Sequence, residues 1–235
     1  MEVYFILILL VLVALAIGSF VSAVSYRIPR DLNFSKGRSF CDLCQKYLKW
    51  YDNIPLFSYF FYFGKSRCCG QKISIRYPLI EAASVLGACI LFLLFPFLEF
   101  ILYYSLFVTL LTILVIDIEH QIIPDELVWL TLLISILIVN TSLLTTLFFA
   151  FLFSTFLLSI YILTSGKGMG LGDVKLAIPL GLVLGQEKGL VWLLSTFIIG
   201  GIVALFLLVL KKAKLKTKIA FGPFMIVAFW ITLML

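Results

Sequence analysis

Apolar runs, each about as long as a bilayer is thick, are the feature that most limits how this chain can fold. Of its 235 residues, 63% are hydrophobic and only 13% are charged, whereas a soluble domain is typically about half apolar and a quarter charged. A helix needs about 20 mostly apolar residues to cross the hydrocarbon layer. The composition therefore excludes a water-soluble globule and predicts an all-α, polytopic membrane bundle of about eight transmembrane helices.

The predicted spans are 3–23, 79–98, 100–116, 127–140, 142–164, 174–185, 190–210 and 219–235. No Lys or Arg precedes the first run, so it is predicted to be a permanent helix rather than a cleaved secretory signal. The run 174–185 is short, and it is either a full span kinked at Pro179 or a re-entrant half-helix. Three parts result: a first helix at 1–24, a basic loop with cysteines at 25–78, and a membrane-embedded core at 79–235.

The distribution of basic residues predicts the topology. The loop 25–78 holds ten Lys or Arg and three acidic residues, and loops of this kind stay in the cytoplasm. The N-terminus is then outside. The connections 117–126, 165–173 and 211–218 fall inside as well, which leaves only Lys188 on the outer side. The net charge of +6 therefore reports topology, and it does not imply a nucleic-acid partner.

Four acidic residues lie in or beside the predicted spans, namely Glu81, Glu99, Asp117 and Asp173. Because an ionisable group at membrane depth is costly, each calls for a partner or a function. The topology places Asp117 and Asp173 at one cytoplasmic depth on different helices, where two carboxylates can share a proton. This is the requirement for aspartic-peptidase chemistry, in which one carboxylate activates water and its protonated partner donates.

The segment before Asp173 contains glycine at positions 166, 168, 170 and 172. Glycine allows close backbone approach, which gives an extended substrate strand room to lie beside the aspartate. A structural role is the alternative: Asp173 caps the helix after a flexible turn. The corresponding alternative for Asp117 is a pairing with Lys175, or a plain helix end at the interface.

These segments also resemble a known family. Residues Gly170 to Asp173 match the GxGD motif, and Asp117 through Pro124 to Asp125 matches its partner segment, so the chain resembles the bacterial prepilin peptidases, which are type IV leader peptidases and intramembrane aspartic proteases. The resemblance covers nearly the whole chain and extends to Gly18–Phe20, Arg27–Pro29, Asp52–Pro55, Arg76–Pro78 with Glu81, and Phe221–Phe224.

The resemblance implies cleavage of the short basic leader of type IV prepilins or pseudopilins, just before their apolar helix, at the cytoplasmic face of the bacterial cytoplasmic membrane. It implies Asp117 and Asp173 as the catalytic dyad. Gly170 and Gly172 are expected to shape the substrate cleft, with Lys175 and Glu81 as supporting residues. Peptidolysis needs no cofactor. Many family members also methylate the new N-terminus with S-adenosylmethionine, and the sequence assigns no segment to that activity.

The loop cysteines leave two interpretations open. Cys41 and Cys44 form a CxxC, and Cys68 and Cys69 follow, in a compartment where thiols stay reduced. Two CxxC pairs would predict zinc. However, family members with both pairs would place the second near 66 and 69, and here position 66 is Ser66. Either the four thiols hold zinc, or they are residual thiols or a partial site.

Four other functions are weaker interpretations of the sequence. A proton- or sodium-coupled transporter typically has repeated halves, which this sequence lacks. A non-catalytic assembly protein would use the glycine segment for helix packing and the basic loop for acidic lipid or a partner. A metal site around His120, with Asp117, Asp125 and Glu126, lacks the second histidine of intramembrane metalloproteases, and His120 has no glycine-flanked serine nucleophile to serve.

Overall fold

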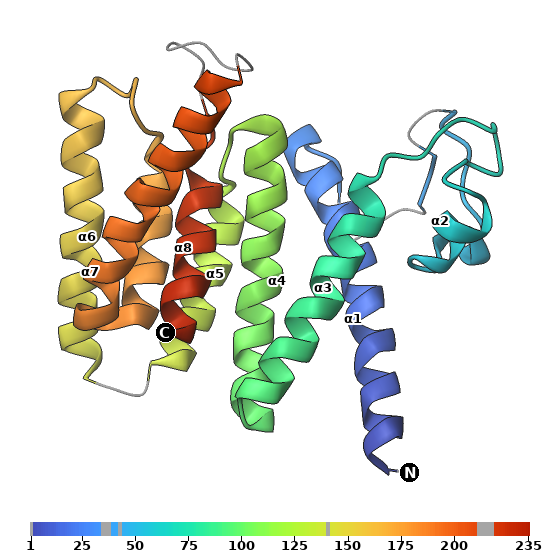
Figure 1. Ribbon diagram of the computed structural model, residues 1–235, viewed down its shortest axis with the longest axis horizontal. Helices are drawn as coiled ribbons and strands as arrows, with labels where there is room; N and C mark the ends of the chain where they lie inside the picture. The colour runs from blue at the N-terminus through green and yellow to red at the C-terminus, as the bar shows by residue number, and fades with distance from the viewer. Residues whose placement is uncertain (1, 34–38, 42–43, 140–141, 211–218) are drawn as a thin grey trace. The chain divides into compact units, whose positions relative to one another are not determined.

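The computed structural model describes residues 2–33, 39–41, 44–139, 142–210 and 219–235. Within these ranges the chain is all-α, as predicted, with two isolated β-bridges and no strand. The elements are α1 (Glu2–Arg27), η1 (Ile28–Arg30), η2 (Trp50–Asn53), α2 (Phe57–Phe61), α3 (Arg76–Leu94), α4 (Phe97–His120), α5 (Asp125–Ile138), α6 (Leu143–Leu163), α7 (Leu171–Val209) and α8 (Gly222–Met234) (Figure 1).

Five of these helices, α1, α3, α4, α6 and α7, are long and apolar enough to cross a membrane. The protein is therefore an integral membrane protein. Each predicted run falls on a helix, but the count of eight spans is not confirmed. Helices α5 and α8 have 14 and 13 residues. At 1.5 Å per residue such helices reach only about 21 Å, against about 30 Å of hydrocarbon.

Helix α7 is broken at Gly185, whose φ of 65° and ψ of −157° are not helical. This break separates the two runs that were predicted as 174–185 and 190–210. Pro179, where the sequence predicted a kink, lies inside α7 with helical φ and ψ, and the non-helical residue of α7 is Gly185. The physical reason is that proline removes one hydrogen bond but fits helical angles, whereas a positive φ is readily adopted only by glycine.

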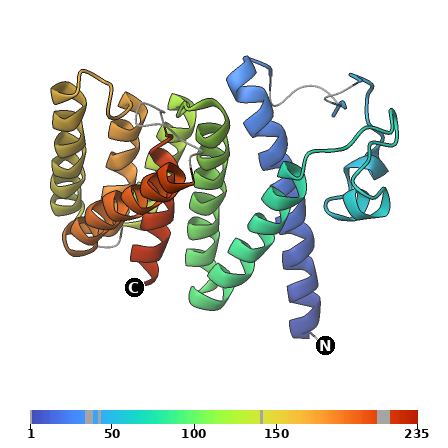
Figure 2. The same cartoon turned by 45° about the horizontal axis from the view of Figure 1, so that its top comes forward.

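The chain forms two compact units, Met1–Thr112 and Ile113–Leu235. In the first unit, α1 packs directly on α3 (Figure 1, Figure 2). A Cβ on Gly18 of α1 would lie 2.7 Å from the Glu81 Cα. The Ser84 hydroxyl of α3 donates to the Ala14 carbonyl at 2.8 Å. Small residues thus permit this close crossing.

In the second unit, α7 packs against α5, α6 and α8. The fully buried Trp192 of α7 donates its Nε1–H to the Met225 carbonyl of α8 at 2.9 Å. The Ser154 hydroxyl of α6 donates to the Val174 carbonyl at 2.8 Å. Because water is absent from a bilayer core, such hydrogen bonds satisfy the polar atoms within the protein. The Ser154 bond fixes the first part of α7 against α6, and the Trp192 bond fixes the part after Gly185 against α8.

Candidate active site and cysteine cluster

Asp117 and Asp173 both lie in the second unit, and both are buried. Asp117 is in the last turn of α4 and is 4% exposed, and Asp173 is in the first turn of α7 and is 6% exposed. The two carboxylates interact electrostatically. The structure therefore brings together, from separate helices, the two side chains that the sequence paired. Among the other acids singled out, Glu99 is exposed.

The glycine-rich segment holds Asp173 in place. Its Oδ2 accepts a hydrogen bond from the Gly170 backbone N–H at 3.0 Å, and Gly170 is the N-cap of α7. Asp173 is thus the third residue of the helix rather than its cap. A Cβ on Gly172 would lie 2.8 Å from the Ile123 Cβ. The GxGD segment is therefore packed directly against the connection that follows Asp117.

Asp117 has a neighbour that the sequence did not assign to the site. The Gly222 backbone N–H at the start of α8 is a hydrogen-bond donor to the Asp117 carboxylate. A Cβ on Gly222 would lie 2.5 Å from Asp117 Oδ2. Among the residues that the structure describes, Oδ2 itself is buried without a hydrogen-bond partner. Gly222 belongs to the Phe221–Phe224 segment, which was the only sequence signal for a third element here.

Lys175 pairs with a different acid from the one considered in the sequence. Its Nζ contacts both carboxylate oxygens of Asp125, at 2.8 and 2.9 Å. The alternative that Asp117 pairs with Lys175 is therefore wrong. The pair lies at the exposed N-terminal ends of α5 and α7, where a chelated ammonium joins the two helices. This leaves the buried Asp117 carboxylate free of a cation from Lys175.

Glu81 lies in the first unit and holds the loop onto α3. Its buried carboxylate accepts a hydrogen bond from the Leu56 N–H at 2.8 Å and another from the Ser19 hydroxyl. These contacts tie α1, the loop and α3 together.

The four cysteines converge, although their spacing is atypical. The sulfur atoms of Cys41, Cys44, Cys68 and Cys69 all lie within 4.8 Å of one another. The Cys44 and Cys68 sulfurs are 3.0 Å apart, and this hydrogen bond raises the pKa of Cys44 to about 12. In the described ranges this is the only group of three or more His, Cys, Asp or Glu residues placed to hold a metal ion. The described residues around His120 do not form such a group.

Two equivalent turns build this cluster, 25 positions apart. In the first, Cys41 N–H donates to the Lys46 carbonyl at 2.9 Å and Gln45 N–H donates to the Cys41 carbonyl at 2.8 Å. In the second, the same two bonds join Ser66 to Gln71 and Gly70 to Ser66, both at 2.7 Å. Bridges between 40 and 47 and between 65 and 72 close the two turns. Ser66 thus occupies the position of Cys41, and Cys68 supplies the additional thiol.

The fold and these sites define a polytopic helical membrane protein with a paired-aspartate centre and a cysteine cluster. Residues 12–95 match the bacterial peptidase A24 N-terminal domain, and residues 104–205 match the type IV leader peptidase family. The chain belongs to the type IV leader peptidase family, as the resemblance predicted.

Its relatives include three proteins named prepilin leader peptidase/N-methyltransferase. The Klebsiella pneumoniae protein is 36% identical over 76% of this chain and 85% of its own length. The Pectobacterium carotovorum protein is 31% identical over 90% of this chain and 86% of its own length. The Pseudomonas putida protein is 28% identical over 100% of this chain and 92% of its own length. No solved structure matches the chain significantly.

Proposed function

We propose that this protein removes the leader of type IV prepilins or pseudopilins, with Asp117 and Asp173 as its catalytic dyad. The observation that carries the proposal is the pairing of these two buried, electrostatically interacting carboxylates from α4 and α7 in a member of the type IV leader peptidase family. Two carboxylates in a poorly solvated site favour a state with one shared proton.

The chemistry follows from that shared proton. The ionised carboxylate takes a proton from a water molecule, whose oxygen attacks the scissile carbonyl carbon, while the protonated carboxyl donates to the carbonyl oxygen. On collapse the carbon–nitrogen bond breaks, and the amine leaves with the proton that the first carboxylate had taken. As the carbon–oxygen double bond re-forms, the proton on the former carbonyl oxygen returns to the second carboxylate. The dyad then returns to its one-proton state. Asp117 Oδ2, buried without a partner among the described residues, is an oxygen that such a water or proton would use.

The supporting residues have three different roles. Gly170 leaves backbone room beside Asp173 for an extended substrate segment, and its N–H fixes one carboxylate oxygen. Gly172 shapes the cleft in another way, by admitting the Ile123 side chain, which a Cβ at this position would meet at 2.8 Å. Lys175 acts indirectly, since its ion pair with Asp125 holds the starts of α5 and α7 together. Glu81 supports the loop 25–78 through its bond from Leu56.

The substrate and topology proposals rest on charge. The basic residues of 25–78 favour a cytoplasmic loop, which puts the N-terminus outside and the dyad at the cytoplasmic face of the bacterial cytoplasmic membrane. The lysines of 211–218, which support the same topology, lie outside the described residues. A prepilin or pseudopilin would present its basic leader there and leave its apolar helix in the lipid bilayer.

Co-expression with a prepilin that carries a basic leader, a glycine and an apolar helix tests this function. We expect the substrate to shorten by the mass of its leader, with cleavage just after the glycine, because that bond lies at the membrane boundary. Intact-mass spectrometry measures it. A transporter or an assembly protein would leave the prepilin mass unchanged, and an unprocessed prepilin beside abundant, inserted enzyme would contradict the proposal.

A second activity belongs to the same proposal. The relatives are named N-methyltransferases as well as peptidases, and we expect this chain to methylate the amine that cleavage exposes. Its methyl donor would be S-adenosylmethionine, which the family uses. The mass of the processed N-terminus reports this activity in the same experiment, as one additional methyl group.

Zinc is the metal that fits the cysteine cluster. In a tetrahedral site with zinc–sulfur distances of about 2.3 Å, the four sulfur atoms lie about 3.8 Å apart. The sulfur–sulfur distances here are 3.0 Å between Cys44 and Cys68 and 4.0 Å between Cys41 and Cys69, and these values bracket the tetrahedral one. A hard cation such as Mg²⁺ prefers oxygen ligands, and the donor set here is all sulfur. The ion would tie the two equivalent turns together and stabilise the loop, with no step of peptidolysis passing through it.

Substitution of Cys68, the thiol outside the CxxC spacing, tests this metal site. Because Ser66 stands at the position equivalent to Cys41, we expect Cys68→Ser to remove most bound zinc and Ser66→Cys in the same chain to restore it. Zinc per chain, measured by plasma mass spectrometry after dialysis, checks both. Cys89, which lies on α3 away from the cluster, provides the control as Cys89→Ser. Equal zinc in the wild type and Cys68→Ser would exclude Cys68 as a ligand.

A further inference from the structure

Helix α2, in the loop between α1 and α3, turns three phenylalanine rings outward. Phe57, Phe60 and Phe61 share one helix face, because they are spaced i, i+3 and i+4, and they are 61%, 68% and 62% exposed. The ring centroids of Phe57 and Phe61 stack at 5.7 Å. Ser58 is buried instead, and its hydroxyl donates to the Tyr51 carbonyl at 2.8 Å. We call the three rings the α2 aromatic face, and an exposed apolar cluster of this kind typically marks an interaction surface.

The ends of α1 and α3 indicate where the membrane surface lies. Arg27 is the last residue of α1, and Arg76 is the first residue of α3. Long basic side chains near the ends of membrane helices reach into the headgroup layer. The two helix ends are at one level, because Arg76 Nη2 donates to the Ser25 hydroxyl of α1 at 2.7 Å. The headgroup layer on this side of the bilayer therefore lies near Arg27 and Arg76.

The loop is bound to these helices on the bilayer side of that level. Leu56, the residue before α2, donates its N–H to Glu81 Oε2 at 2.8 Å, and Glu81 lies five residues after Arg76. The Ser19 hydroxyl, six residues before Ser25 on α1, is a second donor to this carboxylate. At 1.5 Å per residue these positions lie about 7–9 Å deeper than the Ser25–Arg76 contact. Helix α2 therefore begins near the boundary between headgroups and hydrocarbon, and it lies level with the first turns of α3 (Figure 1, Figure 2).

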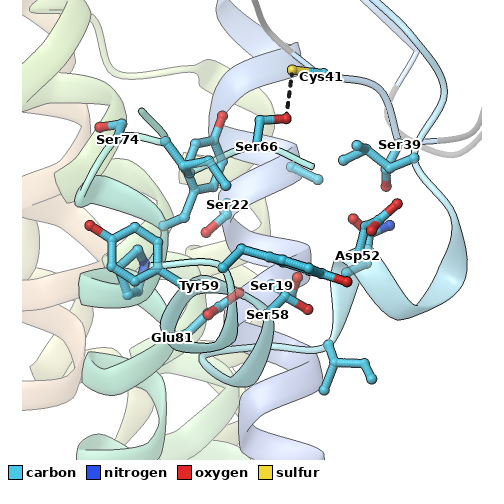
Figure 3. A pocket seen from close by; sticks show the side chains of 18 of the residues that line it. Ser19, Ser22, Ser39, Cys41, Asp52, Ser58, Tyr59, Ser66, Ser74 and Glu81 are labelled. Atoms are coloured by element: carbon cyan, nitrogen blue, oxygen red, sulfur yellow. Dashed lines mark hydrogen bonds between the residues drawn. The ribbon is translucent and has the colours of Figure 1, made fainter. Parts of the chain in front are cut away.

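The cysteine turns lie at the opposite end of this unit from α2. Between them is a cavity of about 450 Å³. Its labelled side chains in Figure 3 are Ser19, Ser58 and Glu81 at one end, and Cys41 and Ser66 at the other. Ser22, which follows Ser19 along α1 toward the headgroup level, lies nearer the cysteine end (Figure 3). The α2 aromatic face is thus at the bilayer end of the loop, and the cysteine turns are at its water end.

We propose that the α2 aromatic face inserts into an anionic lipid surface, at the boundary between headgroups and acyl chains on the side of Arg27 and Arg76. Helices that lie at this boundary bury Trp, Phe and Leu about 5–10 Å into it. The loop 25–78 carries ten Lys or Arg against three acidic residues, and this charge favours anionic headgroups. A soluble protein partner fits less well, because a surface at this depth meets lipid. The inference is independent of the peptidase activity.

Photo-crosslinking in vesicles tests this contact directly. The full-length chain, with p-benzoylphenylalanine in place of Phe60, is reconstituted into vesicles of phosphatidylethanolamine and phosphatidylglycerol. On irradiation the excited ketone abstracts hydrogen from a nearby C–H group, and the two carbon radicals join. Intact-mass spectrometry identifies the chain that carries one lipid. We expect phosphatidylglycerol in these adducts to exceed its share of the vesicle lipid at least twofold.

Two other positions carry the same probe as controls. Gln71 is exposed in the second cysteine turn, where its carbonyl accepts from the Ser66 N–H at 2.7 Å, and it is expected to give at least tenfold fewer lipid adducts than Phe60. Leu86, within α3, is 63% exposed, which is close to the exposure of Phe60. It is expected to give abundant lipid adducts and so to show that the probe reacts with lipid. The unfolding temperature of each labelled chain shows that the fold is kept.

Three results would overturn the proposal. If the probe at Phe60 labels lipid no more than the probe at Gln71, while the probe at Leu86 labels it, the α2 aromatic face does not insert. If the probe at Phe60 labels a co-reconstituted prepilin in place of lipid, the face is a substrate surface. If phosphatidylglycerol appears in the adducts only in proportion to its share, the anionic preference is wrong. Leader cleavage is scored separately by the mass of the prepilin, so none of these results decides the proposed function.

Discussion

Asp117→Asn and Asp173→Asn are each expected to abolish prepilin cleavage while leaving the protein inserted and abundant. The dyad needs one ionised and one protonated carboxyl group, and an amide supplies neither. Loss of a general acid or base lowers a rate by about 10²–10⁴-fold, and here both roles pass through the same pair, so the rate is expected to fall by more than about 10²-fold. The cleavage rate is measured on a co-expressed prepilin from the decrease in its mass.

Glu99→Gln is the matched control, because Glu99 is an exposed acid in the first turn of α4, the helix that carries Asp117. It is expected to cleave at the wild-type rate. The unfolding temperature of the two Asn variants is expected to stay level or rise, since each removes one of two neighbouring buried carboxylates. Wild-type cleavage by both Asn variants would remove the proposed mechanism.

Gly222→Ala is expected to reduce cleavage about 100-fold with little loss of stability. The new Cβ would lie 2.5 Å from Asp117 Oδ2, so the carboxylate must move. A carboxylate is the end of a rotatable side chain and moves at small cost to folding. A displacement of about 1 Å in a reacting group, however, costs about 10²-fold in rate. The substitution therefore separates positioning of the dyad from stability of the fold.

Gly201→Ala provides the comparison, since a Cβ there meets nothing within 4 Å and the residue lies inside α7. It is expected to keep wild-type cleavage and to gain slightly in stability, because alanine is the better helix former by about 1 kcal/mol. Cleavage rates and unfolding temperatures of both variants are the measurements. If Gly222→Ala cleaves as fast as Gly201→Ala, the start of α8 does not position Asp117.

In the cysteine loop, Cys68 supplies the thiol that a second CxxC pair would have placed at position 66. The sequence places a serine where a second CxxC would begin, which left the metal site open. The backbone forms the expected second turn anyway, with Ser66 at its first position. The neighbouring Cys68 brings its sulfur to 3.0 Å from that of Cys44. Spacing along the chain did not reveal this, because the ligand geometry depends on how two turns face one another.

Hydropathy alone determined that this chain is a helical membrane protein. The sequence also marked Asp117 and Asp173, because an ionisable side chain in an apolar run is costly to bury in a bilayer and is therefore rare unless it has a partner or a function. Only the tertiary structure decided that α7 breaks at Gly185, that Lys175 pairs with Asp125, and that Gly222 lies against Asp117. These depend on which surfaces of separate helices meet. Hydrophobic periodicity sets which residues are buried, but packing between helices sets which of them touch.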